Sequence, residues 1–182
     1  RPEVVVQRMS ALDPQFSGQF REGRIRIRPV DTAELSAGHF AHLVRRHVEE
    51  RGSKVVIIDS LNGYQSSMMG EEYLDAHLHE LVSYLGEQGV ASFLVVSQTG
   101  VLEAESSVNI TYLADNVLYF RFFEAEGEVR RAISAIKVRT GAHERSIREL
   151  LFTSTGISLG PPLRKYRGIL SGMPFLFGES GG

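Results

Sequence analysis

The strongest candidate for a functional residue is Asp59, which directly follows four apolar residues, Val55 to Ile58. Residues 54–59 are therefore predicted to form a buried parallel strand that carries a carboxylate at its C-terminal end. At that edge of a sheet a carboxylate can hold Mg²⁺, usually through water, beside a bound phosphate. A carboxylate that only caps the following loop gives the same pattern, so both interpretations stay open. Ser60 either helps to order such a metal site or is a simple turn residue.

Two cations form a second candidate site. Lys137 and Arg139 are two residues apart on a predicted strand, so their side chains project from the same face. Adjacent cations repel unless an anion lies between them, and the alternative is a solvated cationic face. Gln98 directly follows the apolar segment 90–96 and faces the same sheet edge as the aspartate; it is either a ligand-sensing amide or a loop amide satisfied by backbone. His143 is a weaker candidate for a ligand-binding residue, because it is a single histidine with no second one nearby in the sequence.

The other histidines lack the spacing of a metal site. His39 and His42 are three residues apart on one predicted helix. His77 and His79 are two apart and face differently. Neither pair has the spacing of a helical i, i+4 pair with a carboxylate as third ligand, so we interpret them as surface or interhelix residues.

The composition is that of a soluble globular protein. The chain has 182 residues, 42% of them hydrophobic and 23% charged, a net charge of −2 and a pI of about 6.3. This charge recruits neither nucleic acid nor an anionic membrane. No apolar run approaches the roughly 18 residues that span a bilayer, and we expect no signal peptide. The chain has no cysteine, which excludes disulfides and thiolate metal sites and is consistent with a cytoplasmic location.

These candidate residues must be positioned by an α/β fold. Strands and helices alternate from residue 24 to 97, which is typical of a mostly parallel sheet with right-handed crossovers. Antiparallel hairpins follow at one edge. We expect one domain over residues 1–160 and an irregular C-terminal tail over 161–182. The expected helices are 2–12, a helix opened by Asp31 and Glu34 that runs to Glu50, and 71–87; the expected strands are 24–28, 54–59, 90–96, 116–123, 129–139, 147–154 and 157–159; a loop is expected through Asn62 and Gly63.

Five segments together resemble one family. They are Asp59-Ser60-Leu61-Asn62-Gly63-Tyr64, Ser97-Gln98, Glu128-Val129-Arg130-Arg131-Ala132-Ile133, Lys137-Val138-Arg139-Thr140-Gly141-Ala142-His143 and Ile147-Arg148-Glu149. The chain resembles the RecA-type ATPase domain of KaiC-like proteins, the circadian clock type, over nearly its whole length. The most specific part is the Lys-x-Arg strand followed by His and by Ile-Arg-Glu.

The resemblance implies a role for each candidate residue. Asp59 would be the Walker B aspartate that holds Mg²⁺, ordered by Ser60, and Gln98 would sense the terminal phosphate of ATP. Lys137 and Arg139 would reach the neighbouring subunit's phosphate, as an arginine finger does, and His143 would line the nucleotide pocket. The assembly would be a homo-oligomeric ring, a hexamer, that hydrolyses ATP slowly in signalling or timing, with a signalling protein as a further partner.

One element of a nucleotide site does not occur in these 182 residues. The three lysines are Lys54, Lys137 and Lys165, and none follows a glycine loop of the form Gly-x-x-x-x-Gly-Lys-Ser/Thr. The resemblance places that P-loop upstream of Arg1, so we expect the chain alone to be inactive. The clock ATPase also autophosphorylates an adjacent Ser-Thr pair. Here the equivalent position is Thr111-Tyr112, so a two-site phosphorylation cycle is not expected.

Two other functions fit part of the pattern. A non-catalytic module without a P-loop could pack against partner chains and regulate them. A DNA recombinase shares the RecA topology, but the acidic balance and the lack of a basic strip disfavour binding to nucleic acid. A Gly-x-x-x-x-Gly-Lys-Thr sequence upstream of Arg1 would separate the ATPase from the regulatory module.

Overall fold

The computed structural model describes residues 1–31, 35–67, 73–97, 112–154, 156–171 and 173–176. It contains two compact units, which are described separately. The α/β unit is Pro29–Thr99, and the β unit combines Arg1–Arg28 with Gly100–Gly182. No helix among the described residues is both long enough and apolar enough to cross a bilayer. The prediction that residues 1–160 form one domain stays a prediction.

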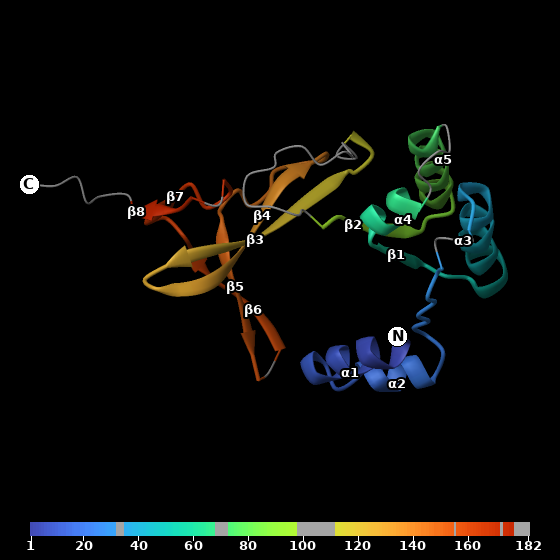
Figure 1. The fold of residues 1–182 in the computed structure, drawn as a ribbon, viewed down its shortest axis with the longest axis horizontal. Coiled ribbons are helices and arrows are strands. Elements are labelled where there is room, and N and C mark those ends of the chain that lie inside the picture. The colour runs from blue at the N-terminus through green and yellow to red at the C-terminus, as the bar shows by residue number, and fades with distance from the viewer. Residues whose placement is uncertain (32–34, 68–72, 98–111, 155, 172, 177–182) are drawn as a thin grey trace, which may run out of the picture. The chain divides into compact units, whose positions relative to one another are not determined.

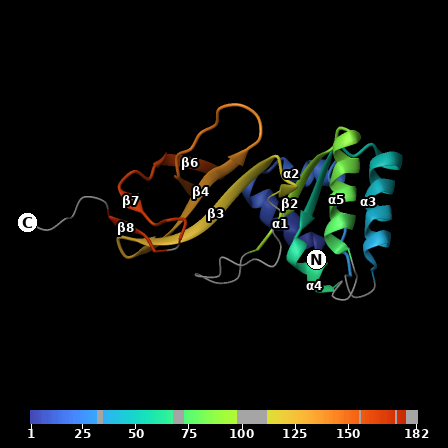
Figure 2. The same ribbon diagram turned by 90° about the horizontal axis from the view of Figure 1, so that it is seen from above.

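The α/β unit is built around two parallel strands (Figures 1 and 2). Asp59 of β1 lies opposite Val95 of β2, and Val55 lies opposite Ala91. Helices α3 and α5 pack against each other, and α5 also packs against β2. The elements in chain order are α3 (Ala37–Arg51), β1 (Val55–Asp59), α4 (Leu61–Ser67), α5 (Leu74–Glu87) and β2 (Ala91–Val95).

Capping residues fix the ends of α3. The Ser36 hydroxyl accepts a hydrogen bond from the His39 backbone N–H at 3.2 Å, which satisfies one of the free donors of the first turn. Gly52 ends the helix with φ 62°, in the left-handed region that glycine adopts without steric cost. The predicted start at Asp31 is therefore wrong, because Ser36 provides the cap; Glu34 lies outside the described residues.

Leucines and two aromatic rings form the core of the α/β unit. Leu78, Leu81 and Leu85 of α5 are almost fully buried, at the spacing of one helix face. The ring of Phe40 on α3 lies 5.0 Å from that of Tyr64 on α4. At the periphery, α3 and α5 are joined by Arg45–Glu80 at 2.8 Å and by Tyr84–Glu49 at 2.9 Å.

Only one face of the β1–β2 pair is covered by this core. Ile58 is buried on the covered face, whereas the other face carries exposed apolar side chains. They alternate along each strand, as pleated strands require, and Ile57 lies opposite Phe93 in the register. These residues are Val55, Ile57, Phe93 and Val95.

Two local predictions are wrong. Residues 24–28 alternate Arg and Ile but form no strand; the N–H groups of Arg24 and Ile25 instead donate to the Gln19 carbonyl at 3.0 and 3.3 Å. These local bonds close the turn after α2. The predicted loop at Asn62 and Gly63 is the helix α4, because burial of its apolar side chains outweighs the turn preference of Asn-Gly.

The β unit contains a four-stranded antiparallel sheet in the order β3-β4-β5-β6. The β3–β4 hairpin turns at Glu126 and Gly127, whose φ angles of 57° and 76° are those of a two-residue type I′ turn. Residues 161–182, expected to be irregular, include the end of β6 and two short strands. The elements are α1 (Pro2–Leu12), α2 (Phe16–Arg21), β3 (Asn116–Ala125), β4 (Glu128–Val138), β5 (Arg148–Thr153), β6 (Gly156–Pro162), β7 (Tyr166–Arg167) and β8 (Phe175–Leu176).

The two faces of this sheet differ. The inner face carries a small core of Phe123, Ala125 and Ala132, which packs with Ile169. The other face, here called the outer face, is apolar and exposed. Its exposed apolar residues include Leu118, Phe120, Phe122, Val129, Phe152, Ile157 and Leu159. The mixed α/β class, with parallel strands followed by antiparallel hairpins, is thus confirmed.

Candidate functional site

Asp59 lies at the C-terminal end of β1, as the sequence predicts. Its backbone is the last residue of the parallel ladder, opposite Val95. The side chain is exposed, and among the described residues none forms an ion pair or hydrogen bond with its carboxylate. The carboxylate is therefore available to a ligand. It does not cap the described part of the following segment, which is the alternative interpretation.

Two buried side chains hold the segment after Asp59. Leu61 is fully buried and Tyr64 nearly so, one helical turn apart in α4. Ser60 is half-buried, and its carbonyl accepts a hydrogen bond from the Tyr64 N–H at 3.3 Å. The Asp59–Ser60 peptide bond is cis. Ser60 thus begins the helix with a backbone bond and belongs to no turn of the predicted kind.

Asn62 joins the ends of the two strands. Its Nδ2 donates to the Ser97 carbonyl at 2.9 Å, and its Oδ1 accepts from the Ser97 N–H at 2.7 Å. Sequence reasoning assigned Asn62 only to a loop. The signal that could have found it is the position itself, because a carboxamide three residues after a strand-end aspartate can reach the end of the next strand.

The two candidate cations lie in the β unit. Lys137 is half-buried in β4 opposite Val117, beside a bulge between Val117 and Leu118. Arg139 follows the end of β4. Its N–H donates to the Asp115 carbonyl at 2.8 Å, and its Nη1 lies 2.6 Å from Asp115 Oδ1. These side chains are 62% and 64% exposed, so Arg139 is paired within its own chain but stays open to solvent.

His143 is half-buried in the segment between β4 and β5. The neighbouring carboxyl group of Glu144 accepts from the Ser146 N–H and from Arg148 Nη2, both at 3.1 Å. Hydrogen bonds from Ser146, and then from Arg148, lower the pKa of Glu144 from 4.5 to about 2. A carboxylate that stays ionised is therefore fixed one residue from His143.

The structure places the candidate residues in both units. Asp59 and Ser60 belong to the α/β unit, whereas Lys137, Arg139 and His143 belong to the β unit. Gln98 and Thr111 lie outside the described residues. The predicted roles of all these residues stay predictions.

Comparison with known proteins identifies the family. A family model described as "ATPase: KaiC" matches residues 6–164. The chain belongs to the KaiC family. Circadian clock protein KaiC3 of Synechocystis sp. is 24% identical over 182 residues, which are 98% of this chain and 35% of that protein. The circadian clock oscillator protein KaiC of Thermostichus vulcanus is 25% identical over 158 residues, 85% of this chain and 30% of that protein. This KaiC-family chain thus spans about a third of the length of those relatives.

A solved structure confirms the RecA-type fold. The KaiC-like protein from the hyperthermophilic archaeon Pyrococcus horikoshii OT3 superposes with a TM-score of 0.73 at 21% sequence identity. The alignment covers 88% of this chain and 71% of that chain.

The donor set of this KaiC-family chain fits Mg²⁺ better than a transition metal. Among the described residues no three His, Cys, Asp or Glu side chains gather to hold a metal ion. Mg²⁺ usually keeps several waters and is held by one or two carboxylates together with substrate phosphates. One exposed carboxylate at a strand end, unpaired within the described part of the chain, meets that requirement. Asp59 is the described candidate residue that would hold the ion.

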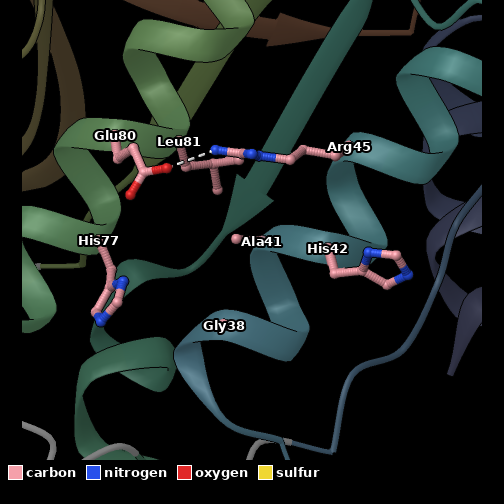
Figure 3. Close-up of a pocket in the computed structure, with 7 residues that line it drawn as sticks. All are labelled: Gly38, Ala41, His42, Arg45, His77, Glu80 and Leu81. Atoms are coloured by element: carbon pink, nitrogen blue, oxygen red, sulfur yellow. Dashed lines mark hydrogen bonds and ion pairs between the residues drawn. The ribbon is translucent and has the colours of Figure 1, made fainter.

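A hollow with a volume of about 220 Å³ lies between α3 and α5. Figure 3 shows His42 and His77 on either side of Ala41, with Arg45 paired to Glu80 above them. The imidazole rings do not converge, and Glu80 already neutralises the guanidinium. This hollow is therefore no formed metal or anion site.

Proposed function

We propose that this chain is part of a KaiC-type ATPase that binds Mg-ATP and hydrolyses it slowly at the interfaces of a hexameric ring, in signalling or timing. The observation that supports this most directly is Asp59, an exposed carboxylate with no partner among the described residues, at the C-terminal end of a parallel strand in a KaiC-family chain. When Mg²⁺ is bound beside the phosphates, it neutralises the charge that develops on them. Asp59 would hold that ion, and Ser60 begins the helix that follows the aspartate. Gln98 keeps its sequence-based role as sensor of the terminal phosphate.

In this proposal the cations of the β unit serve the neighbouring subunit. Lys137 and Arg139 approach the neighbour's terminal phosphate, and His143 lines the pocket. The Arg139–Asp115 pair is mostly exposed, and such pairs contribute only about 0.2–1 kcal/mol. A phosphate offers more charge and bidentate geometry to a guanidinium than one exposed carboxylate does. Arg139 can therefore leave Asp115 at little cost when a nucleotide-bearing neighbour is present.

The test is subunit mixing in the full-length protein. Asp59→Ala removes the Mg²⁺ ligand, and Arg139→Ala removes the cation that acts on the neighbour. Arg139→Ala should lower kcat by about tenfold or more while the Kd for Mg-ATP changes by less than about threefold; fast GTPases lose more from such a change. In mixed rings some interfaces combine an intact Asp59 with an intact Arg139. Part of the activity should then return.

Arg164→Ala is the matched control, because Arg164 is an exposed arginine of the same unit. It should leave kcat unchanged. If mixed rings form, as shown by native mass spectrometry, and no activity returns, the role in trans is wrong. If Arg139→Ala leaves kcat unchanged, the role in trans is also wrong. Lys137 and Arg139 then form a solvated cationic face.

A second candidate function is a non-catalytic regulatory module. It is favoured by one observation, the lack of a Gly-Lys loop in these 182 residues. Calorimetric titration of the full-length protein with Mg-ATP separates the two functions. An ATPase should bind with a Kd near or below about 10 μM, which is about −7 kcal/mol. No measurable binding would favour the module.

A further inference from the structure

We propose that Asn62 is a positioning residue that holds the Mg²⁺-binding aspartate in place by extending the β1–β2 ladder past its last backbone pair. This role rests on the proposed function. The carboxamide lies just beyond the point where the ladder ends. The backbone pairing of the parallel strands ends at Asp59 and Val95, because the chain turns from Asp59 into α4.

The carboxamide of Asn62 takes the place of the missing backbone partner. It offers one donor and one acceptor in a plane, as a peptide group does. Both are used by Ser97, two residues beyond the last paired residue of β2, at 2.9 and 2.7 Å. Asp59 is therefore bracketed by the backbone ladder on one side and by this side-chain bridge on the other.

Asn62 cannot easily leave this position. The two residues that flank it on the inner face of α4, Leu61 and Tyr64, are buried. Tyr64 also packs against Phe40 of α3, with ring centroids 5.0 Å apart. The helix that carries the carboxamide is thus packed in the core. Its hydrogen bonds to Ser97 hold the end of β2 to that helix.

The chemistry explains why such a bridge would be needed. Mg²⁺ requires nearly ideal octahedral geometry, so a small displacement of a ligand weakens its binding. A misplacement of about 1 Å in a catalytic group can lower the rate about 100-fold. An aspartate at the free end of a two-stranded ladder is prone to such displacement. The bridge restrains it without touching the ion.

The test uses the full-length protein with Asn62→Ala and Asn62→Leu. Alanine removes the bridge, and leucine removes it while keeping the side-chain volume, so equal effects assign the change to the hydrogen bonds. Gln88→Ala is the matched control, since it truncates an exposed carboxamide near the opposite end of β2. The readouts are amide hydrogen exchange at Ser97, the Mg²⁺ concentration for half-maximal ATPase activity, and kcat against KM.

Both Asn62 variants should exchange the Ser97 amide faster. They should need about three- to tenfold more Mg²⁺ and lose about tenfold in kcat, with the KM for Mg-ATP changed by less than about threefold. Gln88→Ala should match the wild type in every readout. Faster exchange at Ser97 with unchanged Mg²⁺ dependence and kcat overturns the positioning role and leaves a structural bridge. Unchanged exchange overturns the bridge itself.

These outcomes separate this inference from the proposed function. If the wild-type protein hydrolyses no ATP in the presence of Mg²⁺, the ATPase function fails, and the positioning role fails with it. If the wild type is active and both Asn62 variants match it, only the positioning role fails. The freed groups of Ser97 are exposed and can bond to water, so the variants should fold.

Discussion

At the scale of single residues, the best-formed polar contact of the β unit lies away from the candidate site. Arg130 Nε donates to Glu149 Oε1 at 2.7 Å, and Nη2 donates to Oε2 at 2.5 Å. The side chains are 24% and 12% exposed, so both charges are largely removed from water. The hydrogen bonds from Arg130 lower the pKa of Glu149 below 4.5 against the effect of burial. This bidentate pair joins β4 to β5.

We predict that Arg130→Ala lowers the free energy of unfolding by about 2 kcal/mol at pH 7, because it leaves the Glu149 carboxylate without its partner. The pKa of Glu149 is lower in the folded chain. The pair therefore stabilises fully above pH 4.5, the usual pKa, and loses its effect as the pH falls through the folded value. The deficit of the variant should shrink between pH 7 and pH 3 in urea unfolding.

Arg46→Ala is the control for this prediction. Arg46 pairs with Glu50 at 3.1 Å, but both side chains are more than half exposed. Its loss should cost no more than about 0.5 kcal/mol at either pH. Equal deficits for the two variants at pH 7 would contradict the role of burial.

The sequence predicts a residue of the candidate site only where that residue's own neighbours in the chain reveal its position. Asp59 was placed at the end of a strand because four apolar residues precede it, and the structure places it there. Asn62 was not recognised, because its function depends on Ser97, which lies 35 residues away. The partner of Arg139 was missed for the same reason. Which side chains pair between distant segments depends on how those segments are aligned. Hydrophobic periodicity predicts the strands and helices but not their alignment.

At the scale of elements, sequence patterns succeeded where burial and local preference agree. The leucines of α5 recur at helical spacing, and the helix ends at Glu87 as predicted. Residues 24–28 failed because alternation describes a strand only when another strand is available as a partner, and local bonds to Gln19 are formed instead. The turns of the β unit show a similar dependence on context.

Gly127 and Gly168 have nearly equal φ angles, 76° and 73°, but different surroundings. A Cβ at Gly127 would meet no atom within 4 Å, whereas one at Gly168 would collide with the Met173 carbonyl oxygen. Gly127→Ala should therefore cost about 1 kcal/mol, the cost of the left-handed conformation alone. Gly168→Ala should cost about 3 kcal/mol, because steric overlap is added.

Urea unfolding of the two glycine variants checks this prediction. The comparison isolates the steric cost, because the φ angles of the two glycines are nearly equal. Near-equal losses of stability would show that the turn between β7 and β8 adjusts freely around the added methyl group.

At the scale of the whole molecule, each unit exposes apolar surface. In the α/β unit it is the uncovered face of β1 and β2, and in the β unit it is the outer face of the antiparallel sheet. Contiguous apolar patches of this kind mark surfaces that bind other protein segments. The family, the RecA-type fold and the α/β class could be read from the sequence. The exposure of these faces could not, because alternation does not reveal what covers a strand.

We predict that the 182-residue chain, prepared by itself, self-associates through these faces. Light scattering should give a mass above 20.2 kDa that rises with concentration. Replacing Phe120 with Lys should reduce the association, since a charge then lies within the outer face. Lys in place of exposed Gln88 is the control and should have no such effect. A monomer at high concentration would show that the chain is a self-sufficient domain.

One residue of the outer face makes this association depend on salt. The Arg131 guanidinium lies over two rings, 5.6 Å from the centroid of Phe122 and 5.0 Å from that of Phe152. A fixed positive charge thus lies within the apolar surface, and two copies meeting through that face bring like charges together. The Debye length falls from about 10 Å at 0.1 M salt to about 3 Å at 1 M, so salt removes this repulsion. Low ionic strength should therefore keep the chain dispersed, and Arg131 acts as an electrostatic gatekeeper against its precipitation.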